Sequence, residues 1–581
     1  MKIKKLLFTA AVVITVILAL TVGVSATGFI RGDFNGDGIV DSDDAVYLLY
    51  HSFFPVKFPV DQWTDLTGDE NVDSEDAIFL LYHSFEPEEY PFAECSEHIP
   101  AVDKGIEPTC AEPGLTEGSH CYVCGIVLDS QEELPAQHNY TDGICTGCGE
   151  PAPSEGLNYT LSNDESYYIV SGMGTCTDIN VKIPPVYNGK PVREIGEGAF
   201  EDCRKLTGIV IPDGVTSIGS YAFSGCWDLT SVNIPDSVIS IGSYVFNYCS
   251  GLTSITIPYG VTSISEGTFI YCSGLISVGI PDTVTSIGTG SFEGCSDLTS
   301  IDIPDGVTEI ESRAFIYCEK LTLIDIPDSV TSIGKQAFSE CWDVTTINIP
   351  DTVTSIGDGA FSGCSSLTSI DIPDTVESIG DGAFYGCSGL ISVVIPDKTT
   401  RINDMVFGSC SSLKSVDLHG KITVIRSNAF SYCTSLTSID IPDAVTHIGD
   451  SAFSGCSNLA SINISENSKL TNINVGAFAE CSKLMSINIP DGVKVIGPGA
   501  FYGCSTLKSI TIPGTVTSIG NCAFEGCSAL SAITLRNPNG WWGEDTYALK
   551  QTTFPATTLS DPAKASTYFK VIYISYDWYR S

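Results

Sequence analysis

The stretch CWDLTSVNIPDSVISIGSYVFNY, residues Cys226–Tyr248, is one copy of a 23-residue unit that recurs along most of the chain. The cysteine that opens the unit returns at constant spacing from Cys203 to Cys456, and after a two-residue insertion near Glu466 it continues to Cys527. A fixed period of this length is typical of a solenoid, in which each unit buries its apolar face against its neighbours. The sequence therefore predicts a rod of stacked coils.

Apolar residues hold fixed places after each cysteine. Leucine stands at position +3, isoleucine or valine at +6 and +8, and Val, Ile and Phe at +12, +15 and +20, counted from the cysteine. We expect these side chains to point inward, including a phenylalanine ladder from Phe200 to Phe524, and the fifteen ladder cysteines to be buried free thiols. An unbroken ladder of this length leaves no simple disulfide pairing.

The local structure of one coil follows from its residue types. The alternation at +6 to +8 predicts a short strand, and equivalent strands in successive coils would pair in parallel. Pro235 would end the strand because proline has no N–H. Gly242 is expected to form a turn with positive φ. The segment before Phe246 has room for no more than one helical or 3₁₀ turn.

The unit resembles the BspA-like (Treponema-type) leucine-rich repeat. The copy LTLIDIPDSVTSIGKQAFSEC at Leu321–Cys341 follows the family pattern LxxLxIPxxVxxIxxxAFxxC, and the resemblance covers about two thirds of the chain. It implies a mainly β, right-handed leucine-rich-repeat solenoid, an extracellular location, and adhesion or recognition in place of catalysis.

Composition limits the partners that this chain can bind. The 581 residues carry a net charge of −42 with only 28 Lys plus Arg, which disfavours nucleic acid and anionic membranes. Three lysines precede an apolar run at 6–24, and small residues end at Ala26, so residues 1–26 are expected to be a cleaved secretory signal peptide. An uncleaved membrane anchor is the alternative, and no other apolar stretch predicts a membrane span.

Residues 29–92 contain a tandem repeat of 32 residues that places oxygen ligands at calcium-loop spacing. The first loop has Gly38 at its tight turn, whereas the second has Glu70 there and Thr67 at a position usually held by Asn or Asp, so the second site should be weaker. The expected Ca²⁺ ligands are Asp33, Asn35, Asp37, the Ile39 carbonyl, Asp41 and Asp44 in loop one, and Asp65, Thr67, Asp69, Asn71, Asp73 and Asp76 in loop two.

Two such loops, each followed by an apolar helix, resemble a type I dockerin. That resemblance implies a small all-α module that binds a cohesin on a scaffoldin of a cellulosome-like, polysaccharide-degrading complex. The family's recognition positions fall on Ser42, Asp43, Leu49, Tyr50, Ser74, Glu75, Leu81 and Tyr82. A calcium-stapled stability module without a partner is the alternative.

A small Cys-rich knuckle module follows. Cys121 and Cys124, with Cys145 and Cys148, form two CxxCG motifs whose spacing fits a tetrahedral structural Zn²⁺ site. Two disulfides are the alternative, favoured outside the cell. The state of Cys95, Cys110, Cys176 and Cys522 stays open at this point.

The expected domains follow from these features. A hairpin within Tyr159–Val170 and a turn at Asn188-Gly189 should cover the first coil. The aromatic-rich end should be a cap that buries its rings, with a sugar-stacking site as the alternative. The boundaries are 1–26 signal peptide, 27–94 dockerin-like module, 95–156 Cys-rich zinc-ribbon-like spacer, 157–200 N-terminal cap, 201–530 leucine-rich-repeat solenoid and 531–581 C-terminal cap.

The strand side chains at +5 and +7 are expected on the concave surface, where they would form an acidic, hydrogen-bonding face. This face can bind a glycan or a basic protein segment, collect Ca²⁺ weakly, or simply be solvated. The residues of the +7 row that we assign to this surface are Asn233, Asp302, Asp325, Asn348, Asp371, Asp417 and Asp440.

These features predict a secreted, non-enzymatic modular protein that attaches through its dockerin and recognises a protein or glycan ligand with its solenoid. A secreted or surface adhesin with a purely structural calcium module is the alternative. A glycoside hydrolase is disfavoured because no segment outside the repeats is large enough to position two carboxylates in a cleft.

Overall fold

The computed structural model describes residues 100–106, 114–121, 127–134, 140–141, 144–145, 152–545, 551–572 and 576–580. The chain divides into two compact units, residues 1–152 and 153–581. The described part of the first unit consists of short strands that pair antiparallel, β1 with β3, β3 with β4, β2 with β5 and β6 with β7. These strands are β1 (Pro100–Asp103), β2 (Gly114–Leu115), β3 (Gly118–Cys121), β4 (Val127–Asp129), β5 (Glu133–Leu134), β6 (Tyr140–Thr141) and β7 (Ile144–Cys145).

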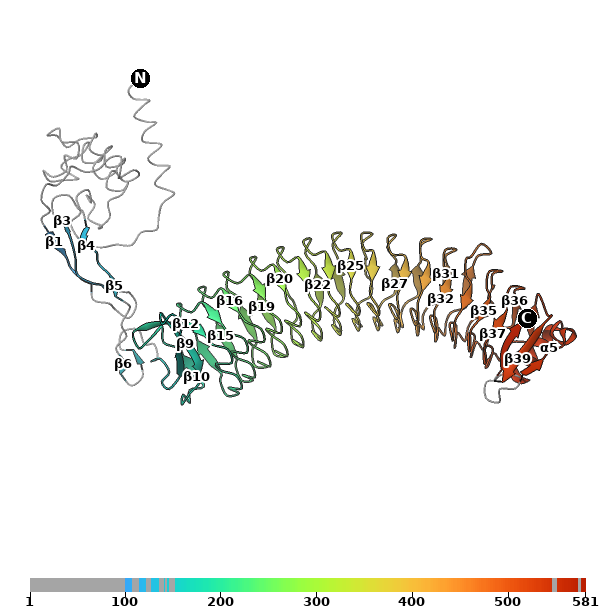
Figure 1. Cartoon of the computed structure of the whole chain (residues 1–581), viewed down its shortest axis with the longest axis horizontal. Helices are drawn as coiled ribbons and strands as arrows, with labels where there is room; N and C mark the ends of the chain where they lie inside the picture. The colour runs from blue at the N-terminus through green and yellow to red at the C-terminus, as the bar shows by residue number, and fades with distance from the viewer. Residues whose placement is uncertain are drawn as a thin grey trace, which may run out of the picture. The chain divides into compact units, whose positions relative to one another are not determined.

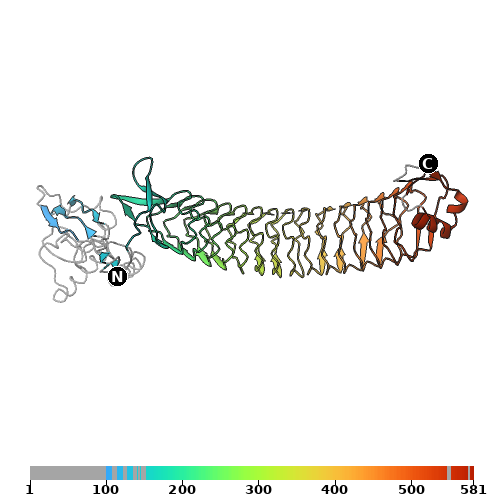
Figure 2. The same cartoon turned by 90° about the horizontal axis from the view of Figure 1, so that it is seen from below.

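The second unit is a solenoid whose coils stack in single file between two caps (Figures 1 and 2). Its first column of strands occupies positions +5 to +7 of the coils, one residue earlier than expected, and paired strands are parallel. Partners within the repeats are 23 residues apart, as for Val232 beside Ile209, whereas the first pair aligns Asn180 with Gly208. The column comprises β10 (Asn180–Lys182), β13 (Gly208–Val210), β15 (Ser231–Asn233), β17 (Ser254–Thr256), β19 (Ser277–Gly279), β22 (Leu323–Asp325), β24 (Thr346–Asn348), β27 (Ser392–Val394), β29 (Ser415–Asp417), β31 (Ser438–Ile441), β33 (Ser461–Ile464), β36 (Ser509–Ile512) and β38 (Ala532–Leu535).

A second column of strands, which the sequence did not lead us to expect, occupies positions +14 and +15. The Ser-Ile pair there alternates between solvent and core, as where Ser240 is exposed and Ile241 is buried. It comprises β12 (Lys190–Ile195), β14 (Ser217–Ile218), β16 (Ser240–Ile241), β18 (Ser263–Ile264), β20 (Ser286–Ile287), β21 (Glu309–Ile310), β23 (Ser332–Ile333), β25 (Ser355–Ile356), β26 (Ser378–Ile379), β28 (Arg401–Ile402), β30 (Val424–Ile425), β32 (His447–Ile448), β34 (Asn472–Ile473), β35 (Val495–Ile496) and β37 (Ser518–Ile519).

The core confirms the predicted inward positions. The ladder phenylalanines from Phe200 to Phe524 are fully buried and stack on one another with ring centroids 5.1–5.7 Å apart. The two-residue insertion leaves this column intact, because Phe453 and Phe478 still stack at 5.4 Å and Leu470 fills the slot of the usual valine. Offset stacking of this kind adds to the free energy of area burial.

The role expected for Gly242 is wrong. This glycine does not have a positive φ; instead it lies against the preceding coil, where a Cβ would be 2.5 Å from the Ser220 nitrogen. Glycine at +16 therefore permits close approach of one backbone to the next. The positive φ values occur at +18 and +22, for example at Tyr244 and Tyr248. The segment between them consists of turns and not of a helix.

Each end of the solenoid is covered by antiparallel strands. At the N-terminal end, β8 (Asn158–Leu161) and β9 (Tyr168–Gly172) form the expected hairpin, and β9 pairs in parallel with β12. The turn between β11 (Val186–Tyr187) and β12 has positive φ at both Asn188 and Gly189. These strands close an edge that would otherwise be free to pair with another chain.

At the other end, β41 pairs antiparallel with β37, and β39 pairs with both β41 and β40. Phe569 packs edge-on against Phe524, the last ring of the ladder. Trp541 and Trp578 are buried, so neither ring is open to a sugar. The elements of this end are β39 (Trp541–Asp545), β40 (Gln551–Thr553), α4 (Ala556–Leu559), α5 (Pro562–Thr567), η1 (Tyr568–Ile572) and β41 (Tyr576–Arg580).

The close packing at +16 predicts the effect of adding one methyl group. A Cβ at Gly380 would be 2.4 Å from the Asp358 nitrogen, whereas a Cβ at Gly420 would meet nothing within 4 Å. We expect Gly380→Ala to cost about 1–3 kcal/mol of stability, the usual cost of overpacking, and Gly420→Ala to cost none. Urea denaturation of the two variants checks this, and equal midpoints would contradict the close approach.

Candidate functional site

The outer face of the first strand column carries the polar row predicted from the sequence. Its +7 side chains are exposed, and two of its Asn–Asp neighbours join adjacent coils. The Asn348 amide donates to Asp325 at 3.1 Å and the Asn463 amide donates to Asp440 at 2.5 Å. The seven residues that we assigned to this face, Asn233, Asp302, Asp325, Asn348, Asp371, Asp417 and Asp440, are all exposed. Their place on a concave surface stays a prediction.

The +10 aspartates that follow the prolines form a second exposed acidic row, which includes Asp236 and Asp374. The +10 row holds an acid in most coils and the +7 row holds Asp or Asn in most, so negative charge runs along the solenoid in both rows and is interrupted more often in the +7 row. Such a line attracts a basic partner over a range that salt shortens to about 10 Å at 0.1 M.

The larger aromatic side chains lie elsewhere, at the turns on either side of the ladder cysteines. Tyr221 stacks on Tyr244 at 5.1 Å, and Tyr248 stacks on Tyr271 at 5.0 Å. The Tyr244 hydroxyl donates to Glu266 at 2.6 Å, and this hydrogen bond, together with partial burial, raises the pKa of Tyr244 to about 12. These tyrosines occupy left-handed positions that also accept glycine, a pattern that the sequence shows but that we did not use.

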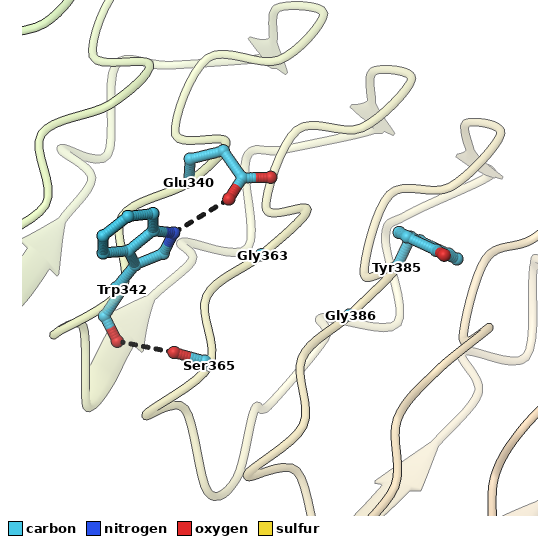
Figure 3. A pocket seen from close by; sticks show the side chains of 6 residues that line it. All are labelled: Glu340, Trp342, Gly363, Ser365, Tyr385 and Gly386. Atoms are coloured by element: carbon cyan, nitrogen blue, oxygen red, sulfur yellow. Dashed lines mark hydrogen bonds between the residues drawn. The ribbon is translucent and has the colours of Figure 1, made fainter.

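One of these turns contains a shallow hollow of about 470 Å³, lined by Glu340, Trp342, Gly363, Ser365, Tyr385 and Gly386 (Figure 3). Trp342 and Tyr385 are 45% and 42% exposed, and both rings are therefore open to a ligand. The Trp342 indole donates to the Glu340 carboxylate at 2.8 Å, and the Ser365 hydroxyl donates to the Trp342 carbonyl at 3.3 Å. The sequence analysis did not identify this site.

The ladder cysteines are free thiols, as expected, and all of them are buried except Cys203, which is half-buried. From Cys226 to Cys527 each thiol donates to the carbonyl of the ladder phenylalanine 26 residues earlier, or 28 for Cys481 after the insertion, as Cys364 does to Phe338 at 3.4 Å. Burial raises the pKa of these thiols, to about 12 for Cys456. A thiol that stays protonated is a poor nucleophile, so the ladder is structural. Cys176 and Cys522 are also free but only half-buried.

Most of the predicted metal and docking residues lie outside the described residues. Outside the described residues lie both calcium loops, all the cohesin-binding positions and the expected signal peptide at 1–26. Cys121 lies in β3 and Cys145 in β7, whereas Cys124 and Cys148 are outside the described part. Calcium, zinc and the choice between zinc and disulfides therefore stay predictions.

The described ranges were searched for metal-binding groups and for membrane-spanning helices. Within them, no group of three or more His, Cys, Asp or Glu side chains is placed to hold a metal ion. None of the helices there has the length and apolarity that crossing a bilayer requires.

Comparison with protein families now identifies the repeat. A model described as the BspA type leucine-rich repeat region (6 copies) matches residues 179–299, 262–391, 377–506 and 471–561. The chain belongs to the BspA-type leucine-rich-repeat family. This confirms the resemblance inferred for the solenoid. It leaves the dockerin resemblance untested.

Comparison with solved structures finds other bacterial leucine-rich-repeat proteins. A leucine-rich repeat protein from Bacteroides ovatus is 31% identical with a TM-score of 0.55, and the match covers 65% of this chain and 93% of that one. A leucine rich cell surface protein from Faecalibacterium prausnitzii is 28% identical with a TM-score of 0.37, over 69% of this chain and 96% of that one. The pneumococcal vaccine antigen PcpA is 17% identical with a TM-score of 0.31, over 54% and 85%. Comparison with curated proteins gives no match.

The thiol ladder predicts how stability depends on pH. A free thiol has a pKa near 8.5 when unfolded, and burial raises the pKa of the ladder thiols well above that value. Between about pH 8.5 and 10 the unfolded chain loses protons that the folded chain keeps, so the free energy of unfolding should fall as pH rises.

Urea midpoints at pH 7.5 and pH 9.5, under reducing conditions, measure this fall. In the double variant Cys364→Val/Cys387→Val the fall should be smaller, because two thiols no longer contribute. A midpoint that stays constant with pH would show that the ladder thiols are not protected in the folded state.

Proposed function

We propose that this is a secreted, non-catalytic recognition protein whose solenoid binds a protein partner through its exposed acidic rows. One observation carries the proposal: the apolar positions of the coils are buried, while the outward +7 and +10 positions of successive coils are mostly acidic or amide side chains. A net charge of −42 makes a basic segment the best-matched ligand. Membership of the BspA-type family supports recognition or adhesion.

Catalysis fits this solenoid poorly. Its carboxylates repeat from coil to coil on open surface, and the described hollow at Trp342 has a single acidic side chain, Glu340. A glycosidase needs two carboxylates held on either side of a bond. We therefore assign no catalytic residue, and turnover of a plant polysaccharide by the purified protein would contradict this assignment.

We further propose that residues 27–94 attach the protein to a scaffoldin as a dockerin. The two loops of oxygen ligands and the repeated Leu-Tyr pairs at 49–50 and 81–82 support this proposal. Ca²⁺ would hold the loops, and Zn²⁺ would hold the four thiols of the adjacent knuckles. An adhesin whose calcium module is only structural is the second candidate, favoured by the family alone.

The acidic rows can be tested by neutralising one at a time. A protein and glycan array probed with the solenoid identifies ligands, and the affinity of each is then measured. We expect Asp302→Asn/Asp325→Asn/Asp371→Asn to weaken binding of a basic ligand by about tenfold or more, with a steeper loss at low salt.

Asp328→Asn/Asp351→Asn/Asp374→Asn removes the same charge from the +10 row. If both triple variants lose affinity equally, net charge and not the +7 row would be responsible.

Attachment through calcium has its own test. A pull-down of residues 27–100 with cohesins of the source organism should succeed with Ca²⁺ and fail with EDTA, because unscreened carboxylates of the loops repel one another without the ion. In the complete chain, Asp33→Ala/Asp37→Ala should abolish capture, and Asp103→Ala is the control outside the loops. Capture that survives EDTA, or no capture by any cohesin, would remove the dockerin proposal.

A further inference from the structure

The hollow at Trp342 combines two open aromatic rings with one carboxylate. Trp342 and Tyr385 stand on either side, and small residues, Gly363, Ser365 and Gly386, line the space between them (Figure 3). These residues come from three successive coils, so the hollow exists only when the coils are stacked. Its two aromatic side chains are 45% and 42% exposed.

The Glu340 carboxylate is held in a defined place. One of its oxygens accepts the Trp342 indole N–H at 2.8 Å, and the other points away from the indole (Figure 3). The missing side chain of Gly363 makes room for it, because a Cβ there would be 2.7 Å from both carboxylate oxygens. None of the ion pairs in the described part of the chain involves Glu340.

At another turn of this solenoid, an exposed tryptophan contacts an arginine side chain of the same chain. The guanidinium of Arg204 lies 4.5 Å from the centroid of the Trp227 ring, and it also reaches Asp202 at 3.5 Å. Trp227 and Trp342 both directly follow a ladder cysteine, and Asp202 and Glu340 both directly precede one, with φ of 56° and 59°. Glu340 stands two residues before Trp342, whereas Asp202 belongs to the preceding coil and reaches Trp227 only through Arg204.

The two turns differ in the residue that the preceding coil supplies. Arg204 stands 23 residues before Trp227, whereas the residue 23 before Trp342 is Glu319. The chain therefore provides a cation for the first indole and has an acidic residue at the corresponding position before the second. Indole is the aromatic ring that binds cations most strongly, and a planar guanidinium can stack on it and pair with a carboxylate at once.

We propose that the hollow at Trp342 binds an arginine side chain of a basic protein segment. The guanidinium stacks on the Trp342 indole and pairs with the free oxygen of Glu340, while Tyr385 bounds the other side. This rests on the proposed recognition function and names its ligand chemistry. A neutral glycan is the competing ligand, and it lacks the charge that Glu340 selects.

The full chain is tested with a labelled peptide that contains two arginines among glycine and serine, and with the same peptide carrying citrulline, which keeps the shape without the charge. Affinity is measured at low salt by fluorescence anisotropy. Trp342→Ser leaves net charge unchanged, and serine occurs at the same place in other coils, as at Ser365 and Ser482. We expect it to weaken arginine binding about fivefold, and Glu340→Gln to do the same.

Matched controls separate the site from general attraction to an acidic surface. Trp227→Ser removes an indole that already has the Arg204 guanidinium over one face, and Glu480→Gln removes the equivalent charge at a turn where Ser482 replaces the tryptophan. Both should change affinity less than twofold. Circular dichroism shows whether each variant is folded. If Trp342→Ser does not fold, the affinity of Glu340→Gln for the arginine peptide tests the proposal.

The proposal is overturned if Trp342→Ser and Glu340→Gln bind the arginine peptide as the parent does, or if the citrulline peptide binds equally well. The second result would point to a neutral ligand such as a glycan. Failure of the array to yield any protein ligand, with the arginine dependence intact, would instead contradict the recognition function and leave the site in place.

Discussion

Stacking of one coil on the next is the constraint on which the rest of this structure depends. A single 23-residue coil has too little apolar surface to fold alone, and its phenylalanine, cysteine and isoleucine side chains are buried only because an identical set lies above and below them. The ladder thiol ties the coils together further, since it donates to the carbonyl of a phenylalanine 26 residues earlier in the chain. Glycine at +16, present in most coils, permits a close approach of successive backbones at that turn.

The same constraint produces the surface. Because every inward position is fixed by packing, variation between coils is confined to the strand faces and to the turns beside the cysteines. Repetition turns an aspartate at +7 or +10 into a line of charge, while an isolated change, such as a tryptophan at Trp342, creates a local site. The acidic rows thus arise where coils carry the same residue, and the hollow arises where one coil carries a residue that differs from the repeat.

The sequence predicts the interior better than the surface. Periodicity identified the buried positions, the parallel pairing and the free thiols, since each is a property of the repeat. It missed the second strand column, because the Ser-Ile pair at 240–241 is too short to show alternation. It also assigned a positive φ to Gly242, because glycine serves both left-handed turns and close backbone approach and the residue type does not distinguish the two.

The periodicity of the sequence could not predict the hollow at Trp342. Trp342 and Tyr385 are 43 residues apart, and they face one hollow because the tyrosine stands just before the cysteine that begins a coil and the tryptophan just after one. Glu340 was one acid among the 70 Asp and Glu of the chain until its hydrogen bond to the indole was seen. The calcium loops and the knuckle thiols, in contrast, were identified from spacing alone, and most of them lie outside the described residues.

Removal of one coil tests the stacking account most directly. Deletion of residues 410–432 takes out a complete unit and brings Cys433 into the place of Cys410, whereas deletion of residues 410–421 removes half a unit and breaks every ladder. The urea-denaturation midpoint of each purified protein is the measurement. We predict that the complete deletion folds with a midpoint close to the parent's and that the half deletion does not fold. A complete deletion that unfolds as readily as the half deletion would contradict the account.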